Sequence, residues 1–463
     1  MYATYNKSAN CEELTATSAC MELLGSLPPK FTFLIVDDIV DVDLSRAIHF
    51  SLDKGYYFSK SLAKIAKVYY VSKTANNHGK KTGDINFIPY SCLDMAFISK
   101  IDYIIFTREA MVSSILVQVP FIKTLILSKN RPKICVRCDN TLWFTAKDIK
   151  KTWGSIFNIK STTPNITAFI LEHIDFIGAQ NASFKADAIK QKVPEHQIII
   201  SSMGIDTHAT DAIDFDNMPN PYAINHNYCV SKLNSWEDTK AFYPDYYIKN
   251  PNLIHELNKP KKIVIYTGRI KTNKGRILNN LNNIMKLLGN DYELHIFPGS
   301  FYTIDESTGI VTTHSAKNAN SLHYLATVSF KDSKNVIIHN PYVHSDKYKW
   351  LYHADCGIDF SFTRPDPKAS SSSAHAKLLE YCEMGLPIVC EEHIQNLYLL
   401  KQCGNSTILP FNASDECYAK AIKDIINNKK IDRKKSAAVC RELESWDRVA
   451  CNYVDQLIAA RNN

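Results

Sequence analysis

Short apolar runs alternate with amphipathic stretches along most of the chain. Residues 31–38 (FTFLIVDD) and 102–109 (DYIIFTRE) are typical of the runs, because each is rich in Ile, Val, Phe and Tyr and is flanked by polar residues. Such runs predict buried β-strands, and the stretches between them, such as 59–67 (SKSLAKIAK), predict helices. This alternation is typical of parallel sheets with helices on both faces. Further strands are predicted at 67–73, 133–140, 175–181 and 197–204.

The alternation lapses over 211–260, which is polar and aromatic and predicts an irregular, partly helical connector. It resumes at 261–270 (KKIVIYTGRI), so we predict two doubly wound, Rossmann-like α/β domains that face a central cleft. The other strands predicted in the second domain are 291–300, 335–343, 356–362, 386–392 and 406–411. The predicted bounds are 1–220 for the first domain, 221–260 for the connector, 261–435 for the second domain and 436–463 for a C-terminal helix that can cross back to the first domain.

Composition narrows the classes of protein. The 463 residues, 45% of them hydrophobic, suffice for two or three cores, yet no apolar run is long enough to span a bilayer. The first twenty residues lack a basic start and an apolar run, so we expect neither a secretory signal nor a transit peptide. We expect a cytoplasmic protein, with peripheral membrane association left open.

Cysteine and charge add little to the choice of function. The CxxC formed by Cys135 and Cys138 has no second pair or His cluster, so buried, reduced thiols are the better interpretation than a metal or redox site. The net charge of +7 suits an anionic small ligand, an anionic membrane surface or nucleic acid, and selects none of them.

The segment 266–281 (YTGRIKTNKGRILNNL) is a candidate phosphate site. A predicted strand runs into Gly268 and Arg269, and Lys274 precedes a helical pattern. Glycine at a strand end lets an anion approach the backbone, and the two basic residues supply positive charge near a helix N-terminus. This arrangement suits a diphosphate, and an ordinary surface loop with basic residues is the alternative.

The segment 369–390 (ASSSSAHAKLLEYCEMGLPIVC) is the second candidate. Its serines can cap a helix whose N–H groups point at phosphates, and Glu380 can accept hydrogen bonds from a ribose diol. The alternative is a solvent-exposed Glu380 paired with Lys377, one helical turn away.

Together, these segments make the second domain resemble the retaining GT-B glycosyltransferases of family GT4 (glycosyl transferases group 1). The resemblance is fainter over 175–206, where Gly204 and Asp206 match the end of that family's first domain. The stretches that carry it are IVIYTGRIKTNKG, DYELHIFPGS, NPYVHSDKYKWLYHADCGIDFS, KLLEYCEMGLPIVC and SWDRVACNYVDQL.

The resemblance implies roles for individual residues. Arg269 and Lys274 would hold the donor diphosphate and stabilise its charge as it leaves. Glu380 would bind the ribose, and Tyr342 and Val343 would lie by the nucleobase. No metal or other cofactor is expected besides the nucleotide-sugar cosubstrate. The full set of expected donor contacts is Gly268, Gly299, Tyr342, Val343, Ser372, Ser373, His375 and Glu380.

The chain departs from the family pattern upstream of Glu380. The family often has a second Glu eight positions earlier, where this chain has Ser372, and a Gly three residues later, where it has His375. The first Glu normally touches the sugar, so the motif does not indicate which sugar is used. His375 could donate to a phosphate or a sugar hydroxyl, or could simply be part of the helix start.

The first domain offers acceptor-side candidates. Asp139 stands where the family often has His and, like Arg137, could touch the sugar or the acceptor; Asp139 could instead cap the next segment. The acidic loop after the first strand could bind a cation, orient acceptor hydroxyls or supply a base, or could serve solubility at a helix start. That loop holds Asp37, Asp38, Asp41 and Asp43, and Arg108 and Glu109 end another strand that either lines the cleft or holds a structural ion pair.

The function implied is a retaining, hexosyltransferase-type enzyme that moves a sugar from a UDP- or GDP-sugar to a hydroxyl acceptor, in glycan synthesis. The acceptor would be a glycan, a lipid-linked intermediate or another hydroxyl compound. A transferase acting on a modified DNA base and a non-catalytic nucleotide-sugar-binding or scaffold protein are the alternatives. A sugar-nucleotide epimerase ranks below them, because the second domain offers no clear acid–base pair of carboxylates.

Overall fold

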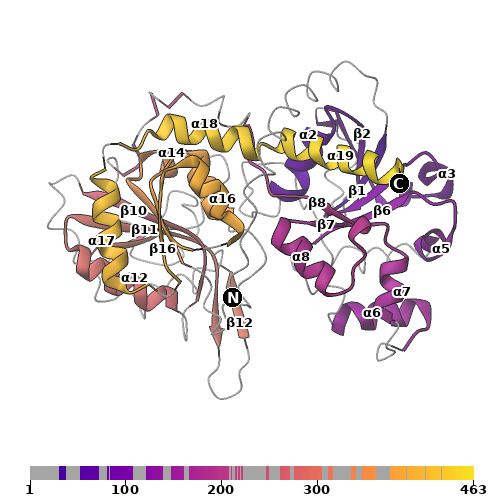
Figure 1. Ribbon diagram of the computed structural model, residues 1–463, viewed down its shortest axis with the longest axis horizontal. Coiled ribbons are helices and arrows are strands. Elements are labelled where there is room, and N and C mark those ends of the chain that lie inside the picture. The colour runs from indigo at the N-terminus through magenta and orange to yellow at the C-terminus, as the bar shows by residue number, and fades with distance from the viewer. Residues whose placement is uncertain are drawn as a thin grey trace. The chain divides into compact units, whose positions relative to one another are not determined.

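The computed structural model divides the chain into two units (Figure 1). Unit 1 comprises Met1–Val42, Ser51–Gly204 and Glu444–Asn463, and unit 2 comprises Asp43–Phe50 and Ile205–Leu443. The finer domain bounds given above stay predictions. The structure describes residues 31–37, 53–71, 81–82, 84–107, 121–138, 147–160, 166–207, 210, 214–215, 217–218, 220–222, 247–249, 261–271, 276–304, 311–315, 335–339, 347–360, 376–392, 394–411, 413–428 and 430–462.

The described strands of unit 1 form one sheet in the order β3-β4-β2-β1-β5-β6-β7-β8. Every neighbouring pair is parallel except β3 and β4. The order reverses direction at β1, as in a doubly wound fold, and the apolar run predicted there is buried on both faces of the sheet. The strands are β1 (Thr32–Val36), β2 (Lys67–Val71), β3 (Lys81–Thr82), β4 (Ile85–Ile88), β5 (Tyr103–Phe106), β6 (Lys133–Arg137), β7 (Phe176–Ala179) and β8 (Ile198–Ile200).

The predicted strands of unit 1 are all present, and the β3–β4 edge was missed. Its β4 alternates buried with half-buried positions, but a four-residue strand and its two-residue partner give too short a pattern to read. The α-helices described in this unit are α2 (Phe58–Leu62), α3 (Met95–Ile98), α5 (Phe121–Leu127), α6 (Lys147–Phe157), α7 (Ile166–Glu172), α8 (Ala182–Lys190) and α19 (Trp446–Asn462).

Helix α19 completes unit 1 by packing along α2 and β8. The Gln456 side-chain amide binds the backbone of Ile200 twice, accepting its N–H at 2.7 Å and donating to its carbonyl at 3.0 Å. The indole of Trp446 lies so close to Gly204 that a Cβ there would sit 2.6 Å from the ring. The glycine matched by the resemblance is therefore required by this packing.

The described strands of unit 2 form a second sheet in the order β16-β15-β14-β10-β11-β13-β9, with β12 paired to β11. The strands are parallel except for β9 and β12, which run antiparallel to their partners. Helices α12 (Arg276–Leu288) and α17 (Asp415–Ile426) pack against each other over one face of this sheet (Figure 1). The strands are β9 (Tyr247–Lys249), β10 (Lys262–Lys271), β11 (Tyr292–Ile304), β12 (Val311–Ser315), β13 (Val336–His339), β14 (Cys356–Asp359), β15 (Ile388–Glu391) and β16 (Ser406–Leu409).

Two features of unit 2 differ from the prediction. Strand β9 lies inside the segment expected to be an irregular connector, and it pairs with β13. Strand β11 continues past residue 300 to pair with β12, which was not predicted. Strands β9 and β12 form only because they pair with β13 and β11, so the local sequence pattern did not indicate either strand.

The remaining α-helices described in unit 2 are α14 (Lys347–His353), α15 (Ala376–Glu383), α16 (Ile394–Cys403) and α18 (Arg433–Glu444). In the part of the chain that the structure describes, no helix is both long and apolar enough to cross a membrane.

Two glycines that follow helices allow a matched test of the packing in unit 2. Gly385 follows α15 at φ +58° and Gly404 follows α16 at φ +66°, so alanine would be strained at both. A Cβ at Gly385 would also overlap the backbone carbonyl of Arg433, whereas a Cβ at Gly404 would meet nothing within 4 Å.

We expect Gly404→Ala to lower the free energy of unfolding by about 1–2 kcal/mol, the cost of the left-handed conformation. Gly385→Ala should cost a further ~1–3 kcal/mol, because the backbone of α18 must shift. Equilibrium urea unfolding of both variants measures the difference. Equal losses would contradict the close contact between Gly385 and Arg433.

Candidate active site

The carboxyl ends of β10 and β14, neighbouring strands of unit 2, meet the N-terminal half of α15. Strand β10 has a register shift between Gly268 and Ile270, and Gly268 adopts a φ of +106°. This conformation is open to glycine and strained for other residues, so the backbone at Gly268 is both irregular and free of a side chain. In doubly wound sheets, ligands bind beyond the carboxyl ends of the strands.

Lys377 of α15 lies under this strand end as a buried cation. Its ammonium donates to Asp359 Oδ1 of β14 at 2.9 Å and to the Tyr266 hydroxyl of β10 at 3.2 Å. The ammonium also lies 4.4 Å from the centroid of the Tyr266 ring. One side chain thereby joins α15 to two strands.

The electrostatic balance keeps Lys377 charged. Burial by itself lowers the pKa of the ammonium, but Asp359 and the hydroxyls of Tyr266 and Tyr381 outweigh burial and raise that pKa above its ordinary value. Burial raises the pKa of the Tyr266 and Tyr381 hydroxyls, so both tyrosines stay neutral.

Tyr381 holds the next turn of α15 against β10. Its hydroxyl accepts the Thr267 N–H at 3.0 Å and donates to the Ile265 carbonyl at 3.4 Å. The ring lies directly over Gly357 of β14, where a Cβ would sit 2.6 Å from it. The backbone on either side of Tyr266 is therefore held by a side chain of α15.

Glu380, the predicted ribose-binding residue, is buried and forms an ion pair with Lys347 of α14. The Lys347 ammonium lies 3.4 Å from Glu380 Oε1, and the two side chains are 5% and 7% exposed. The alternative of an exposed Glu380 paired with Lys377 is wrong. Although one turn apart on α15, these residues pack against different elements, and each meets an opposite charge there.

The structure describes part of the predicted site. Gly268 and Glu380 are described, Gly299 lies in β11, and Arg269 follows Gly268 in β10, although its side chain is outside the description. The predicted site residues that lie outside the described residues are Lys274, Asp139, Tyr342, Val343, Ser372, Ser373 and His375.

Sequence reasoning missed the partners of these residues, Asp359, Lys347 and Tyr381. A signal did exist for two of them. Asp359 ends an otherwise apolar strand, and Lys347 belongs to a short helix whose neighbours Tyr348 and Leu351 are buried. A charge in such a context is buried only when it is paired.

In unit 1, the Arg137 side chain packs against two aromatic rings and binds a backbone carbonyl. Its guanidinium carbon lies 4.6 Å from the Phe58 ring centroid and 5.6 Å from that of Trp446, and the group donates to the Ser202 carbonyl at 3.1 Å. These contacts join β6 to α2 and α19.

Asp37 is the described member of the acidic loop, and it is buried. It accepts a hydrogen bond from the Tyr70 hydroxyl, and Gly55 packs so closely that a Cβ would overlap the carboxylate. Asp37 is therefore not a solubilising surface charge. The other residues proposed for this end of unit 1, Asp38, Asp41, Asp43, Arg108 and Glu109, lie outside the described residues.

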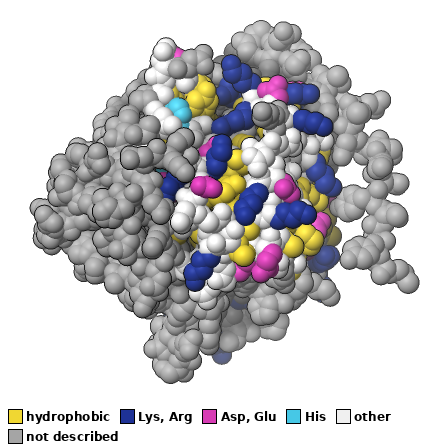
Figure 2. All heavy atoms as spheres, turned by 90° about the vertical axis from the view of Figure 1, so that its left-hand side faces the viewer, with side chains coloured by type: hydrophobic (Ala, Val, Ile, Leu, Met, Phe, Trp, Pro, Cys, Tyr) yellow, Lys and Arg dark blue, Asp and Glu magenta, His cyan; other side chains and the backbone are white. Residues whose placement is uncertain are grey.

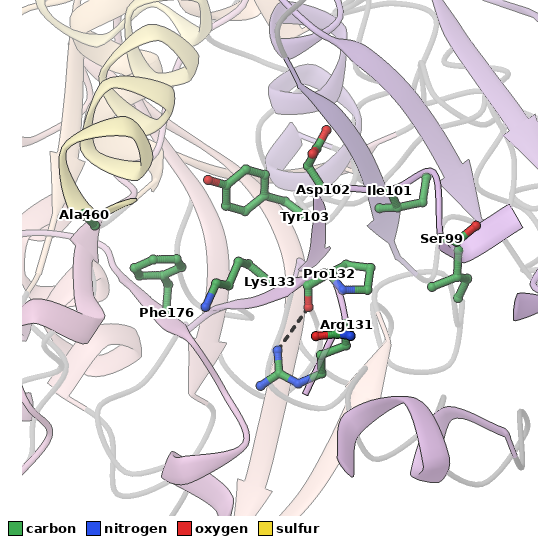
Figure 3. A pocket seen from close by; sticks show the side chains of 11 residues that line it. Ser99, Ile101, Asp102, Tyr103, Arg131, Pro132, Lys133, Phe176 and Ala460 are labelled. Atoms are coloured by element: carbon green, nitrogen blue, oxygen red, sulfur yellow. Dashed lines mark hydrogen bonds between the residues drawn. The ribbon is translucent and has the colours of Figure 1, made fainter. Parts of the chain in front are cut away.

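A cavity of about 360 Å³ lies at the amino ends of β5, β6 and β7 (Figure 3). Its charged groups are occupied, because Arg131 and Lys133 pair with Asp175, and Asp102 accepts the Thr32 N–H at 2.8 Å. It opens at the end of the sheet opposite to the one where ligands bind in this class of fold.

The CxxC thiols and the surface charge give no further site among the described residues. Cys135 and Cys138 are buried and unbridged, burial raises the pKa of the Cys135 thiol, and no described group of three ligating side chains could hold a metal ion. Figure 2 shows Lys and Arg interspersed with Asp and Glu on one face of unit 2, without a continuous basic patch among the side chains described there.

No protein-family model matches the chain, and no curated protein is similar to it in sequence. Solved structures do match. HepE of Anabaena, in complex with UDP and glucose, has a TM-score of 0.53 at 10% identity over 93% of this chain and 100% of that chain. A glycosyltransferase of Rickettsia africae ESF-5 has a TM-score of 0.51 at 12% identity, over 94% and 98% of the two chains.

The N-terminal domain of Candida albicans trehalose-6-phosphate phosphatase is also similar, with a TM-score of 0.50 at 13% identity over 94% of this chain and 98% of that one. The chain has the GT-B fold. This confirms the predicted fold class of two Rossmann-like α/β domains, and membership of family GT4 stays a prediction.

A double-mutant cycle tests the pair formed by Lys347 and Glu380. Lys347→Met and Glu380→Gln should each lower the free energy of unfolding by about 3–5 kcal/mol, because each leaves the other charge buried without its partner. The double variant should lose less than the sum, as measured by urea unfolding.

The pair of Lys190 and Asp187 in α8 supplies the control, because these side chains are 76% and 43% exposed. Their coupling energy should be below about 1 kcal/mol. A coupling energy between Lys347 and Glu380 as small as this would show that the buried pair does not hold α15.

Proposed function

We propose that the chain is a retaining glycosyltransferase of family GT4, which moves a sugar from a UDP- or GDP-sugar to a hydroxyl acceptor in glycan synthesis. The observation that carries the proposal is the cluster at the carboxyl ends of β10 and β14, where Gly268 lies beside Lys377 of α15, the helix that also carries Glu380. The GT-B fold supports it, as does the likeness in fold to HepE, whose structure holds UDP and glucose.

The donor diphosphate would lie against the backbone of Gly268, which has no Cβ to keep an anion away. In this proposal Arg269 and Lys274 bind its oxygens, and the N-terminus of α15 adds the positive end of a helix dipole. Ser372, Ser373 and His375 precede that helix and would supply further donors. The residues proposed for the rest of the donor are Gly299, Tyr342, Val343 and Glu380.

Glu380 suits the ribose because its carboxylate is fixed in place. Its ion pair with Lys347 restricts its rotamers, so it can accept hydrogen bonds from a diol with little loss of side-chain entropy. A buried carboxylate held in this way therefore suits ribose binding better than an exposed, freely rotating carboxylate.

In the proposed reaction, the bond between the anomeric carbon and the diphosphate oxygen breaks while the acceptor oxygen attacks on the same face. The acceptor proton passes to the departing diphosphate, and Arg269 and Lys274 stabilise the charge that develops there. Asp139 is proposed to contact the sugar or the acceptor. The proposed acceptor is a glycan or a lipid-linked intermediate, reached in the cytoplasm.

The first test is binding and turnover with a panel of UDP-, GDP- and ADP-sugars. We expect one UDP- or GDP-sugar to raise the unfolding temperature most, because a ligand that binds only the folded state stabilises it by mass action. The same donor should be hydrolysed or transferred. Binding without turnover on any acceptor would favour the non-catalytic alternative, and no binding to any nucleotide sugar would contradict the proposal.

The second test removes the proposed diphosphate cations. Arg269→Ala and Lys274→Ala should each lower kcat by about 100-fold or more, because each removes charge stabilisation from the leaving group. Lys286→Ala, at an exposed position of α12, is the matched control and should change kcat little. Unchanged activity in both site variants would exclude this assignment of the donor site.

A further inference from the structure

Lys377 has more hydrogen-bonding capacity than its neighbours use. Its ammonium carries three N–H donors, of which Asp359 and Tyr266 accept two. Among the residues that the structure describes, the third N–H has no acceptor within hydrogen-bonding distance. The side chain is only 8% exposed, so bulk water has little access to that donor, and an unmet buried donor is costly.

The same ammonium lies next to Gly268, the glycine of β10, whose φ is positive. A Cβ added to Gly268 would sit 3.2 Å from Lys377 Cε and 3.7 Å from Nζ. A ligand group that approached Gly268 on the side where other residues carry a Cβ would therefore come close to the ammonium.

The place of Lys377 in its helix is also unusual. It is the second residue of α15, in the first turn, where the helix dipole favours anions and disfavours a cation. A cation in the first turn of a helix is unfavourable by itself, and such unfavourable placements are typical of functional sites, where a bound ligand offsets the repulsion. Asp359 supplies part of it, and an anion bound at the helix start would supply the rest.

We propose that Lys377 is a third donor-binding cation, whose remaining N–H binds an anionic oxygen of the nucleotide diphosphate beside Gly268. This inference rests on the proposed function and extends it, since Arg269 and Lys274 are the cations expected from the sequence. Asp359 acts as a positioning residue that keeps the ammonium charged and directed at the strand end.

The competing role is purely structural, in which Lys377 does no more than neutralise Asp359. Lys377→Met removes the cation but also takes its ion pair away from the buried Asp359 carboxylate, which is itself destabilising. Lys377→Met combined with Asp359→Asn removes both charges and restores a neutral pair. The two roles predict opposite results for this double variant.

The experiment compares the affinities of UDP and uridine, and of GDP and guanosine, by isothermal titration calorimetry. For the base that the wild type prefers, Lys377→Met should weaken diphosphate binding roughly 10- to 100-fold, the worth of one charge-assisted hydrogen bond. Nucleoside binding should change less than about twofold, because the nucleoside carries no phosphate. The double variant should show the same selective loss.

Two controls accompany these variants. Asp359→Asn keeps the ammonium but removes the carboxylate that directs it, so it should weaken diphosphate binding less than Lys377→Met does and leave nucleoside binding unchanged. Lys286→Met removes an equal charge from an exposed position of α12 and should leave both affinities unchanged.

Recovery of diphosphate affinity in the double variant would overturn the proposal, and so would an equal loss for nucleoside and diphosphate. A wild-type chain that binds neither UDP nor GDP would refute the proposed function itself, and this inference with it. Failure of the proposal for Lys377 can therefore be distinguished from failure of the proposed function.

Discussion

Helix α15 contributes one residue to each of two buried ion pairs, and these pairs are the constraint on which the rest of unit 2 depends. Each charge loses several kcal/mol of hydration on burial, and only a well-placed partner recovers it. Lys377 must meet Asp359, and Glu380 must meet Lys347, so α15 has a single acceptable position against β10, β14 and α14. Apolar contacts alone would tolerate small rotations of the helix, whereas these pairs do not.

The hydrogen bonds of Tyr381 extend this constraint to the strand end. Its hydroxyl holds the backbone at Thr267, the residue before Gly268, and the contact needs Gly357 beneath the ring. The irregular turn of β10 is thereby fixed by the helix that also carries Glu380. A rigid arrangement of this kind lowers the entropy lost when a ligand binds.

Much of this could be predicted from the sequence, and the reason for each failure is physical. The long parallel strands, such as 261–270, are buried on both faces and leave a strong local pattern, so their existence was predicted correctly. Strands β9 and β12 depend on pairing with distant segments and leave little pattern. Glu380 was proposed as a site residue from its motif, and its ion-pair partner Lys347 was missed, because i,i+3 spacing suggested Lys377 and only the tertiary packing separates the two.

The return of α19 to unit 1 has a consequence for how the protein is made. Lys64 and Asp447 form a salt bridge although 383 positions separate them, and Ile200 and Gln456 are 256 positions apart. Residues 205–443, the larger part of unit 2, are synthesised after the first two segments of unit 1 and before its last segment, Glu444–Asn463. On the ribosome, unit 2 can therefore finish folding first, while the α2 and β8 surface of unit 1 stays uncovered until α19 emerges, and exposed apolar surface of this kind favours aggregation.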